Sequence, residues 1–423
     1  MYLVTSYYKI YNLKSLKKKL YFLGNWCLRD FELIKKFKNT ILDFPWNNKK
    51  LKTSDLKLIE NEYKISINKL SKILNLLHQE DNSVRYWEII VGPWLLEFIS
   101  IVLLKNLELS NLNLKKIKFH IGENILQEQK VFNMKQFWEQ RYSDLFYYNL
   151  TLRIIKIKRI NIKLIKNNIK VPDIKYKESP PSYKDKVIAL LQKNNLIEKS
   201  NKIFFQSSYI PRIWQFFIKI RFLEFFNFSL KEPVLSLTKV NINRDAIKKM
   251  YTKNDSLFQK ILSDLLPIYI PVVYLENYKS VKEYYKNIRP NTKVIYSAND
   301  FLGNDYFKIW ASLKIQEGAK YILGDHGGGF RLQDSQYYFF SKRVSDKFNK
   351  YDNIYYSDRD NFFAPFTKVF NHKISQYQNN ILIITKERKW YSPRVAHEEM
   401  GYEIFTTYKY IKNFCLILKK KKI

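Results

Sequence analysis

The chain has 423 residues and a formal net charge of +35, and 46% of its residues are hydrophobic. This hydrophobic content excludes an intrinsically disordered protein and allows a large core in two or three domains. The charge alone suggests a nucleic-acid-binding protein, but the lysines are scattered and no RNP, zinc-finger or helix-turn-helix motif accompanies them. We therefore expect no specific nucleic-acid partner. A charge-driven polyanion binder stays open as an alternative, as does peripheral contact with an anionic membrane.

The cysteine content and the apolar segments predict a cytoplasmic protein. Cys27 and Cys415 are far apart and lack metal-ligand spacing, so neither a disulfide scaffold nor a metal site is expected. The N-terminus lacks the order of regions of a signal peptide. Residues 89–104 are interrupted by Gly92, Pro93 and a glutamate and are shorter than the roughly 20 apolar residues that a membrane span requires. They predict a buried core helix, in a protein that is soluble or attached to the inner face of a membrane.

The first 180 residues predict a mainly helical region with a few short strands. The apolar patterns predict strands at residues 3–5, 21–23 and 117–121 and helices at 54–77, 85–99 and 137–152. Pro93 falls within the second of these helices and predicts a kink or a break there. Residues 153–177 consist mainly of Lys, Ile and Asn and predict either a solvated connection or a basic amphipathic edge.

From residue 183 the pattern alternates between strands and helices. Strands are predicted at residues 202–207, 272–275, 294–297 and 320–323, and helices at 186–193, 210–226, 244–265 and 306–316. A strand, a helix and a strand at this spacing form a right-handed parallel βαβ unit. Ligands of such sheets bind at the carboxyl ends of the strands. Residues 299–300 and 325–326 are therefore expected at one sheet edge. Residues 381–385 predict the first strand of a further domain.

Residues 320–330, KYILGDHGGGF, contain the most informative motif in the chain. A buried strand runs into a tight turn with His326 followed by Gly327, Gly328 and Gly329. Glycines allow a positive φ and let another molecule approach the backbone closely, and their N–H groups can bind a phosphate or a carboxylate. The alternative is an ordinary glycine turn whose histidine bonds to the backbone.

Three sequence blocks together resemble a known family. They are LVTS…YFLGNWC near the start, SVRYWEIIVGPWLLEFI, and NDYFKIWASLKIQEGAKYILGDHGGGF followed by VSDKF. The chain resembles, from about residue 3 to about residue 394, a family of bacterial transferases found in surface-polysaccharide and nonulosonic-acid gene clusters and known from a leptospiral member. The resemblance implies an α/β fold similar to GT-B glycosyltransferases.

The expected domain organisation follows from this resemblance. Residues 1–370 are expected to form an acceptor-side domain, with a Rossmann-like parallel sheet and a helical N-terminal part. Residues 371–423 are expected to be a stub of a second, donor-side Rossmann-like domain. Family members are longer, so the chain is expected to be truncated at its C-terminus, and the sequence after residue 405 is expected to be unrelated to the family.

The resemblance also implies a reaction, and the strand ends, the glycine turn and the RYW block supply its candidate residues. A sugar would pass from a nucleotide-sugar to a glycan or lipid-linked acceptor, without a metal or another cofactor. The expected catalytic residues are His326, as the base, and Asp300. The expected substrate contacts are Arg85, Trp87, Asn299, Asp325, Gly327, Gly328, Gly329, Arg388 and Arg394.

Several alternatives remain open. Asp325 either orients the His326 imidazole or bonds the amides of the glycine turn. Arg85 either clamps a carboxylate or phosphate of the substrate or pairs with a carboxylate of the core. The whole chain is either a glycosyltransferase-like enzyme or a non-catalytic remnant or accessory subunit.

Overall fold

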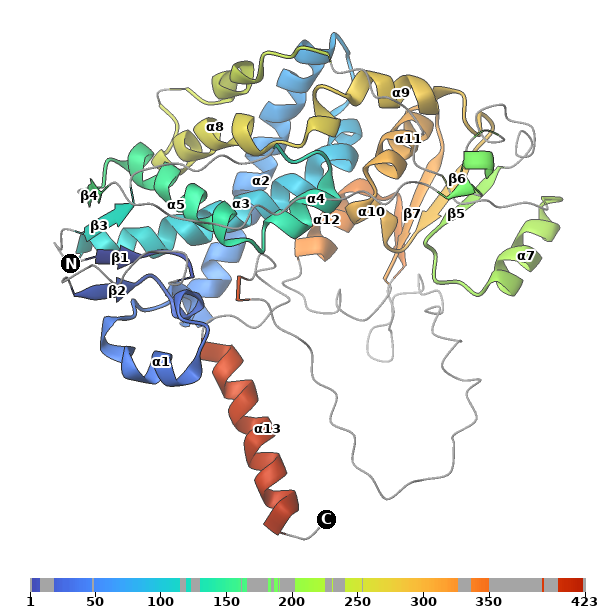
Figure 1. Cartoon of the computed structure of the whole chain (residues 1–423). Coiled ribbons are helices and arrows are strands. Elements are labelled where there is room, and N and C mark those ends of the chain that lie inside the picture. The colour runs from blue at the N-terminus through green and yellow to red at the C-terminus, as the bar shows by residue number, and fades with distance from the viewer. Residues whose placement is uncertain are drawn as a thin grey trace.

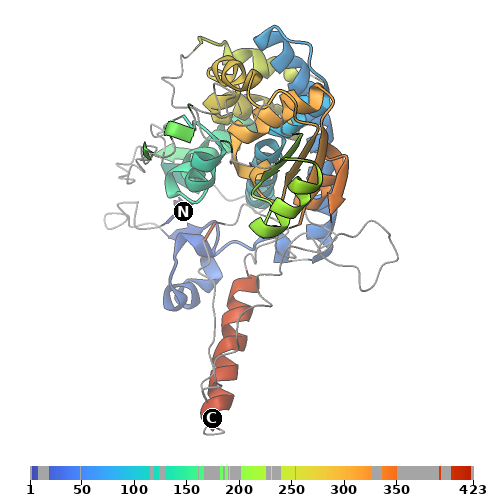
Figure 2. The same ribbon diagram turned by 90° about the vertical axis from the view of Figure 1, so that its right-hand side faces the viewer.

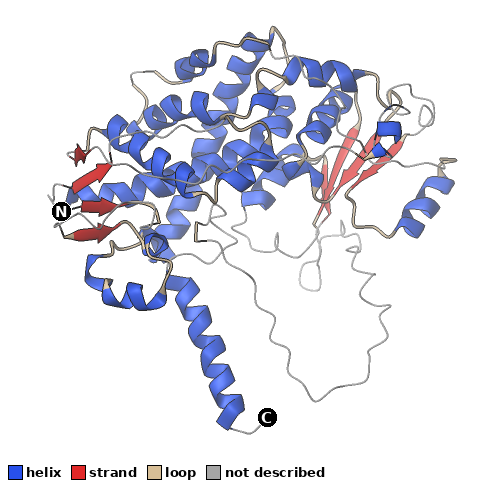
Figure 3. Cartoon of the chain, viewed as in Figure 1, coloured by secondary structure: helices blue, strands red, loops and turns tan. Residues whose placement is uncertain are grey.

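The computed structural model is a mixed α/β protein in which helices predominate and two separate sheets are each wholly parallel (Figure 3). Figure 1 shows the two sheets at opposite ends of a layer of helices. The structure describes residues 2–7, 19–47, 49–114, 119–122, 130–160, 162–165, 182–183, 186–188, 190, 202–224, 230, 240–252, 254–325, 336–349, 390–391 and 402–420.

The first sheet is built from N-terminal strands in the order β2-β1-β3-β4. Its strands are β1 (Tyr2–Val4), β2 (Leu20–Phe22), β3 (Phe119–Gly122) and β4 (Ile162–Ile165). The first three confirm predicted strands. The edge strand β4 lies within residues 153–177, for which no strand was predicted. The N-terminal part, expected to be helical apart from short strands, therefore has a parallel sheet of its own.

The second sheet contains the predicted βαβ units, and its order is β5-β6-β7-β8. Its strands are β5 (Ile203–Gln206), β6 (Val294–Ser297), β7 (Lys320–Gly324) and β8 (Lys347–Asn349). All neighbouring strands run parallel. The helices between them are α7 (Arg212–Arg221) after β5, α10 (Asp300–Gly303) and α11 (Asp305–Gln316) after β6, and α12 (Gln336–Val344) after β7.

Two predictions for residues between β5 and β6 are wrong. Val272–Tyr274 is a 3-10 helix rather than a strand, because Pro271 starts a turn in which the Tyr274 N–H donates to the Pro271 carbonyl. The single helix predicted for residues 244–265 is two elements, a 3-10 helix at Arg244–Met250 and α8 at Leu257–Tyr269. Ser256 starts α8 with a capping box, in which it exchanges hydrogen bonds with Gln259.

The central helix α3 (Val84–Leu114) packs against α2 (Lys49–His78), and α4 (Met134–Gln140) and α5 (Asp144–Lys158) lie nearby (Figure 1). Among the described helices, α3 alone is long and apolar enough to cross a membrane, over Val84–Ser110, and its most apolar 18-residue stretch is entirely buried. This burial confirms the predicted core helix. The helix continues through Pro93, so the expected break is absent.

The remaining helices surround this layer or extend from it. They are α1 (Phe31–Lys36), α9 (Tyr278–Lys286), α13 (Tyr402–Lys420) and the short 3-10 helices at Asn25–Cys27, Lys38–Thr40 and Pro45–Asn47. Figure 2 shows α13 projecting away from the body of the protein. The predicted domain boundary at residue 370 lies outside the described residues, so the division into two domains stays a prediction.

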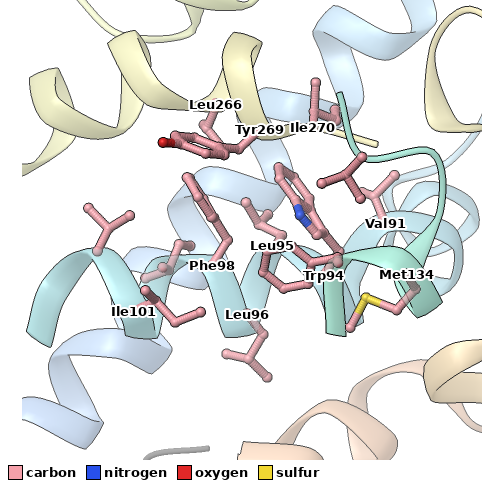
Figure 4. Close-up of a cluster of buried hydrophobic side chains, with 14 of the residues drawn as sticks. Val91, Trp94, Leu95, Leu96, Phe98, Ile101, Met134, Leu266, Tyr269 and Ile270 are labelled. Carbon is pink, nitrogen blue, oxygen red and sulfur yellow. The ribbon is translucent and has the colours of Figure 1, made fainter. Parts of the chain in front are cut away.

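One hydrophobic core joins both sheets to the helices between them. Figure 4 shows Phe98 of α3 beneath Tyr269 of α8, with Trp94 beside Phe98. The rings of Trp94 and Phe98 stack with centroids 5.3 Å apart, and the Phe98 and Tyr269 centroids are 5.4 Å apart. Aromatic side chains bury large areas, and here they fill the middle of the protein rather than a ligand pocket.

The core also contains a buried ion pair at the middle of α3. Glu97 pairs with Arg141, and the two side chains are each 2% exposed. Glu97 also accepts hydrogen bonds from the indole of Trp138 at 3.1 Å and from the Tyr337 hydroxyl. Since a buried charge is tolerated only when it is paired and hydrogen-bonded, these contacts join α3, α4 and α12 in one arrangement.

Candidate functional site

The carboxyl ends of the second sheet gather polar side chains at one edge. Gln206 ends β5 and Ser207 follows it, Asp300 follows β6, Asp325 follows β7, and Asn349 ends β8. Parallel strands bring these ends to the same edge, where ligands of α/β sheets bind. The predicted convergence of residues 299–300 with residue 325 is therefore confirmed, with two further polar residues from β5.

Asp300 is held by neutral donors from two elements. The Gln206 amide donates to Oδ2 of Asp300 at 2.6 Å, and the Ser207 hydroxyl donates to Oδ1 at 2.6 Å. The Asn304 amide donates to Oδ2 at 3.1 Å. Asn299 precedes Asp300 as the N-terminal flanking residue of α10 and makes no capping bond through its side chain. The carboxylate is thus fixed in one orientation at the end of β6.

Gln206 was missed in the sequence analysis, although it fixes this carboxylate. Its side-chain oxygen accepts a hydrogen bond from the Leu230 backbone N–H at 3.1 Å, which leaves the amide nitrogen facing Asp300. Ser207 has a positive φ of 45°, a conformation that costs energy for a residue other than glycine. Gln206 and Ser207 are visible in the sequence as polar residues at the end of an apolar strand. Their partner Asp300, however, lies 94 and 93 residues further along the chain.

Asp325 is buried at the end of β7, and its backbone N–H donates to the Asn349 carbonyl at 2.9 Å. Tyr296 of β6 lies beside it, across Gly324. A side chain at Gly324 would overlap the Tyr296 hydroxyl unless the Tyr296 ring moved, so glycine is favoured there. Burial, followed by the charge of Asp325, raises the pKa of Tyr296 to about 12, so this phenol stays protonated at neutral pH.

Two buried polar atoms at the same edge lack partners among the described residues. They are the hydroxyl oxygen of Ser297, at the end of β6, and the amide oxygen of Asn349, at the end of β8. An unsatisfied buried polar group costs roughly 1–3 kcal/mol. Such atoms are uncommon in folded proteins, and here they flank the end of β7.

The most informative predicted residues fall outside the part of the chain that the structure describes. These are His326, Gly327, Gly328, Gly329, Arg388 and Arg394. The described chain stops at Asp325 and resumes at Gln336, where α12 begins. Because His326 is bonded directly to Asp325, it follows the carboxyl end of β7. Its role as a base stays a prediction.

Arg85 lies at the other end of β7. Its guanidinium donates to the Val344 carbonyl at 3.0 Å and lies 3.1 Å from the Asp346 carboxylate. Asp346 in turn accepts from the backbone N–H of Tyr321, the second residue of β7. From Tyr321 to Asp325 the strand advances about 13 Å. The structure therefore does not bring Arg85 to the edge where Asp300 and Asp325 lie.

Trp87 is fully buried in the core. Its indole donates to Asn75 at 2.6 Å and stacks on the His78 ring with centroids 5.5 Å apart. Its surface is covered by protein, and this placement gives no support to the predicted contact with substrate. The RYW block therefore contributes packing and an ion pair in the described structure.

A buried polar cluster lies at the start of α11, next to the candidate site. Asp305, at the start of α11, pairs with Lys308 at 2.6 Å and accepts from the Tyr274 hydroxyl at 2.5 Å and the Met134 backbone N–H at 2.6 Å. Asn304 caps the same helix by accepting from the Phe307 N–H at 3.0 Å. These contacts fix the start of α11 and, with it, the neighbouring residues 299–304.

The carboxyl edge of the first sheet carries a second charged cluster. Asp144 pairs with Arg29 at 2.6 Å, and it accepts from the Tyr391 hydroxyl at 2.7 Å and from the Tyr7 N–H at 3.1 Å. The ring of Tyr391 stacks on Tyr147 at 4.0 Å. Tyr391, which lies between the predicted phosphate contacts Arg388 and Arg394 in the sequence, is itself held beside the first sheet.

No group of three potential metal ligands occurs among the described residues. The described thiol of Cys27 is buried, and burial raises its pKa to about 12, so it is an inert core residue. Asp358, Arg359 and Asp360 have the Asp-x-Asp spacing and lie outside the described residues. The expected metal-free reaction accordingly stays a prediction.

Comparisons with known proteins give one match. No curated protein and no solved structure matches the chain. A family model described as "LIC12162 family transferase" matches residues 1–416. The match continues past residue 394, where the resemblance was expected to end, and includes most of the tail that was expected to be unrelated. The chain belongs to the LIC12162 family of transferases.

Proposed function

We propose that the protein is a glycosyltransferase that adds a sugar from a nucleotide-sugar to a glycan or lipid-linked acceptor of a bacterial surface polysaccharide, of nonulosonic-acid, lipopolysaccharide or capsule type. One observation carries this proposal. Asp300 and Asp325 lie at the carboxyl edge of a parallel sheet, and Asp325 directly precedes His326 and three glycines in the sequence. This edge is where α/β sheets bind ligands, and membership of a transferase family supports the reaction class.

In this mechanism the acceptor hydroxyl binds beside His326. The neutral imidazole takes the hydroxyl proton as the acceptor oxygen attacks the anomeric carbon of the donor sugar. The bond from that carbon to the nucleotide phosphate breaks, and the nucleotide leaves with the bonding electrons. Asp300 stabilises the charged imidazole or receives the proton from it. The backbone N–H groups of residues 327–329 bind an anionic group of the substrate.

The donor-side residues come, in this proposal, from residues 371–423. Arg388 and Arg394 contact the nucleotide phosphates, and Tyr391 between them is packed against Tyr147 and Asp144. Two parallel sheets joined by helices are compatible with a GT-B-like enzyme, in which two Rossmann-like units share one substrate. The nucleotide-sugar is a substrate, so the proposal requires no further cofactor, and the protein works in the cytoplasm.

The test combines binding with transfer. The purified chain is titrated calorimetrically with CMP- and UDP-linked sugars, and any donor that binds is offered with glycan and lipid-linked acceptors. We expect His326→Ala and Asp300→Asn to leave donor affinity within threefold and to reduce transfer by about 100-fold or more. Arg85→Lys serves as the control, since it changes a residue at the opposite end of β7. Full transfer by His326→Ala would remove the proposed base.

A further inference from the structure

The helix α7 presents an unusually apolar surface to solvent. Ile213 and Trp214 are each 56% exposed and Phe217 is 55% exposed, and Phe216 and Ile220 are exposed beside them. The chain after the helix continues this surface with Phe222 and Leu223. Single exposed apolar residues are ordinary, whereas a contiguous group of this size marks a surface that meets another apolar phase. We call these seven residues the α7 apolar face.

Polar contacts on the inner side of α7 fix its orientation. Lys219 is buried and lies 3.9 Å from Glu224, and Glu224 accepts from the backbone N–H of Ile203 at 3.1 Å. The Gln215 amide donates to the Ile210 carbonyl at 2.7 Å. Ile218 packs against the second sheet and Lys219 is buried beside it, while the aromatic side chains of α7 face outward. The helix cannot roll its apolar face inward without breaking these buried contacts.

Basic residues border the apolar face on both sides. Arg212 and Arg221 are exposed, and they lie nine positions apart, about half a turn around the helix axis. Ile213, Phe216 and Phe217 occupy the arc between them, together with Ile220, while Trp214 borders Arg221. Apolar and aromatic residues flanked by arginines are typical of helices that lie in the interface of an anionic membrane.

Further positive charge lies at the C-terminal end of α7. Lys202 directly precedes β5, and the N–H of the next residue, Ile203, donates to Glu224. The Lys293 N–H donates to the Lys202 carbonyl at 2.7 Å. The Lys320 N–H then donates to the Lys293 carbonyl at 2.7 Å. All three lysine side chains are exposed, so they form a basic row along the amino edge of the sheet. With a net charge of +35, the protein is attracted to anionic lipid headgroups.

We infer that α7 is a membrane-docking helix, which inserts its apolar face into the interface of an anionic lipid bilayer while Arg212 and Arg221 bind headgroup phosphates. The docking itself does not depend on the proposed reaction. Its consequence does rest on the proposed function. Ser207, which contacts Asp300, lies five residues before α7, so docking would place the candidate site near the membrane, where the acceptor would be lipid-linked.

The test measures binding of the full chain to vesicles by sedimentation. Phosphatidylcholine vesicles are compared with vesicles that also contain phosphatidylglycerol. We expect the wild type to bind the anionic vesicles. The double variant Trp214→Ser/Phe217→Ser is expected to lose roughly 30-fold in vesicle affinity, because two half-exposed aromatic side chains no longer transfer into lipid. Arg212→Gln/Arg221→Gln is expected to lose about tenfold on anionic vesicles only.

Matched controls change exposed residues elsewhere. Leu76→Ser removes a highly exposed apolar residue of α2, and Lys57→Gln/Lys72→Gln removes two exposed charges of the same helix. Both controls are expected to bind within twofold of the wild type. In addition, quenching of tryptophan fluorescence by brominated lipid is expected to fall in Trp214→Phe while binding is kept.

Two outcomes would overturn the inference. One is unchanged vesicle binding by Trp214→Ser/Phe217→Ser, which would place any membrane contact elsewhere. The other is a chain that ignores vesicles but forms a dimer that this variant dissociates, which would assign the α7 apolar face to self-association. Neither result concerns sugar transfer, so failure of the docking inference and failure of the proposed reaction are distinguishable.

Discussion

The guanidinium of Arg85 and the carboxylate of Asp346 lie 3.1 Å apart and fasten the start of α3 to the residues before β8. Asp346 also accepts from the Tyr321 N–H and returns its own N–H to the Tyr321 carbonyl, so the contact secures the pairing of β7 with β8. Burial raises the pKa of Asp346, but the Tyr321 N–H and Arg85 outweigh it and hold the pKa below its usual range.

The first prediction separates a structural from a substrate-binding Arg85. Arg85→Ala and Asp346→Asn are each expected to lower the free energy of unfolding by about 1 kcal/mol, because the pair is partly exposed. The double variant should lose less than the sum of the two. Urea unfolding measures all three. A large loss of donor affinity by Arg85→Ala at unchanged stability would restore Arg85 as a substrate contact.

The second prediction concerns the pH dependence of stability through His78. Burial lowers the pKa of His78 from 6.5 to about 4. Its Nε2 lies 3.1 Å from the Tyr274 carbonyl, so the neutral ring carries its proton on Nε2 and donates it to that oxygen. As the pH falls from 6.5 to 4, the unfolded chain takes up a proton that the native state refuses. The free energy of unfolding should fall by about 3 kcal/mol over this window.

The matched variant for this effect is His78→Gln, whose amide can still donate to Tyr274. It is expected to be less stable at pH 7 but to lose less stability between pH 6.5 and 4 than the wild type does. Denaturant unfolding at several pH values measures the difference, and the acidic residues contribute equally to both proteins. Identical pH slopes would show that His78 does not titrate in this range.

The third prediction addresses the buried ion pair between Glu97 of α3 and Arg141 at the end of α4. Glu97→Leu leaves Arg141 buried without its carboxylate and is expected to cost about 3–5 kcal/mol. Adding Arg141→Leu removes the stranded charge, so the double variant should be more stable than Glu97→Leu alone. Guanidinium chloride unfolding compares them. A double variant less stable than the single one would indicate that Trp138 and Tyr337, not Arg141, account for the cost.

The fourth prediction tests the close approach at the end of β7. Gly324→Ala would place a methyl group against the Tyr296 phenol and is expected to destabilise the protein by about 1–3 kcal/mol. Tyr296→Phe in the same chain removes the nearest atom and should recover part of that loss. Thermal unfolding of the two variants gives the comparison. Full stability of Gly324→Ala would mean that the Tyr296 ring moves freely.

The βαβ part of the fold was predictable because buried parallel strands are short apolar runs bounded by polar residues. Val294–Ser297 and the helix Asp305–Gln316 lie where the patterns put them, as does the long core helix around Trp94. The first sheet was not predictable as a unit. Its strands are three or four residues long, and two of them are separated by nearly a hundred residues of helical chain.

The candidate site was predictable at the level of single strand ends but not of contacts. The edge position of Asp300 followed from parallel topology, whereas its bonds to Gln206 and Ser207 depend on the pairing of β5 with β6. Arg85 shows the opposite case. A cationic residue next to an aromatic one is equally typical of a clamp and of an ion pair, and only the position of Asp346 decides which contact forms.

The length of α3 has a mechanical consequence. Near its start Arg85 is tied to the second sheet, and twenty residues later Lys105 lies over the Trp26 ring beside the first sheet, at 4.8 Å. The helix thus spans about 30 Å between the two sheets as a common strut. Pro93 lacks an N–H, so one backbone bond is missing in its first third. Any movement of one sheet relative to the other must therefore bend α3. The helix bends most easily at Pro93, one turn before Glu97.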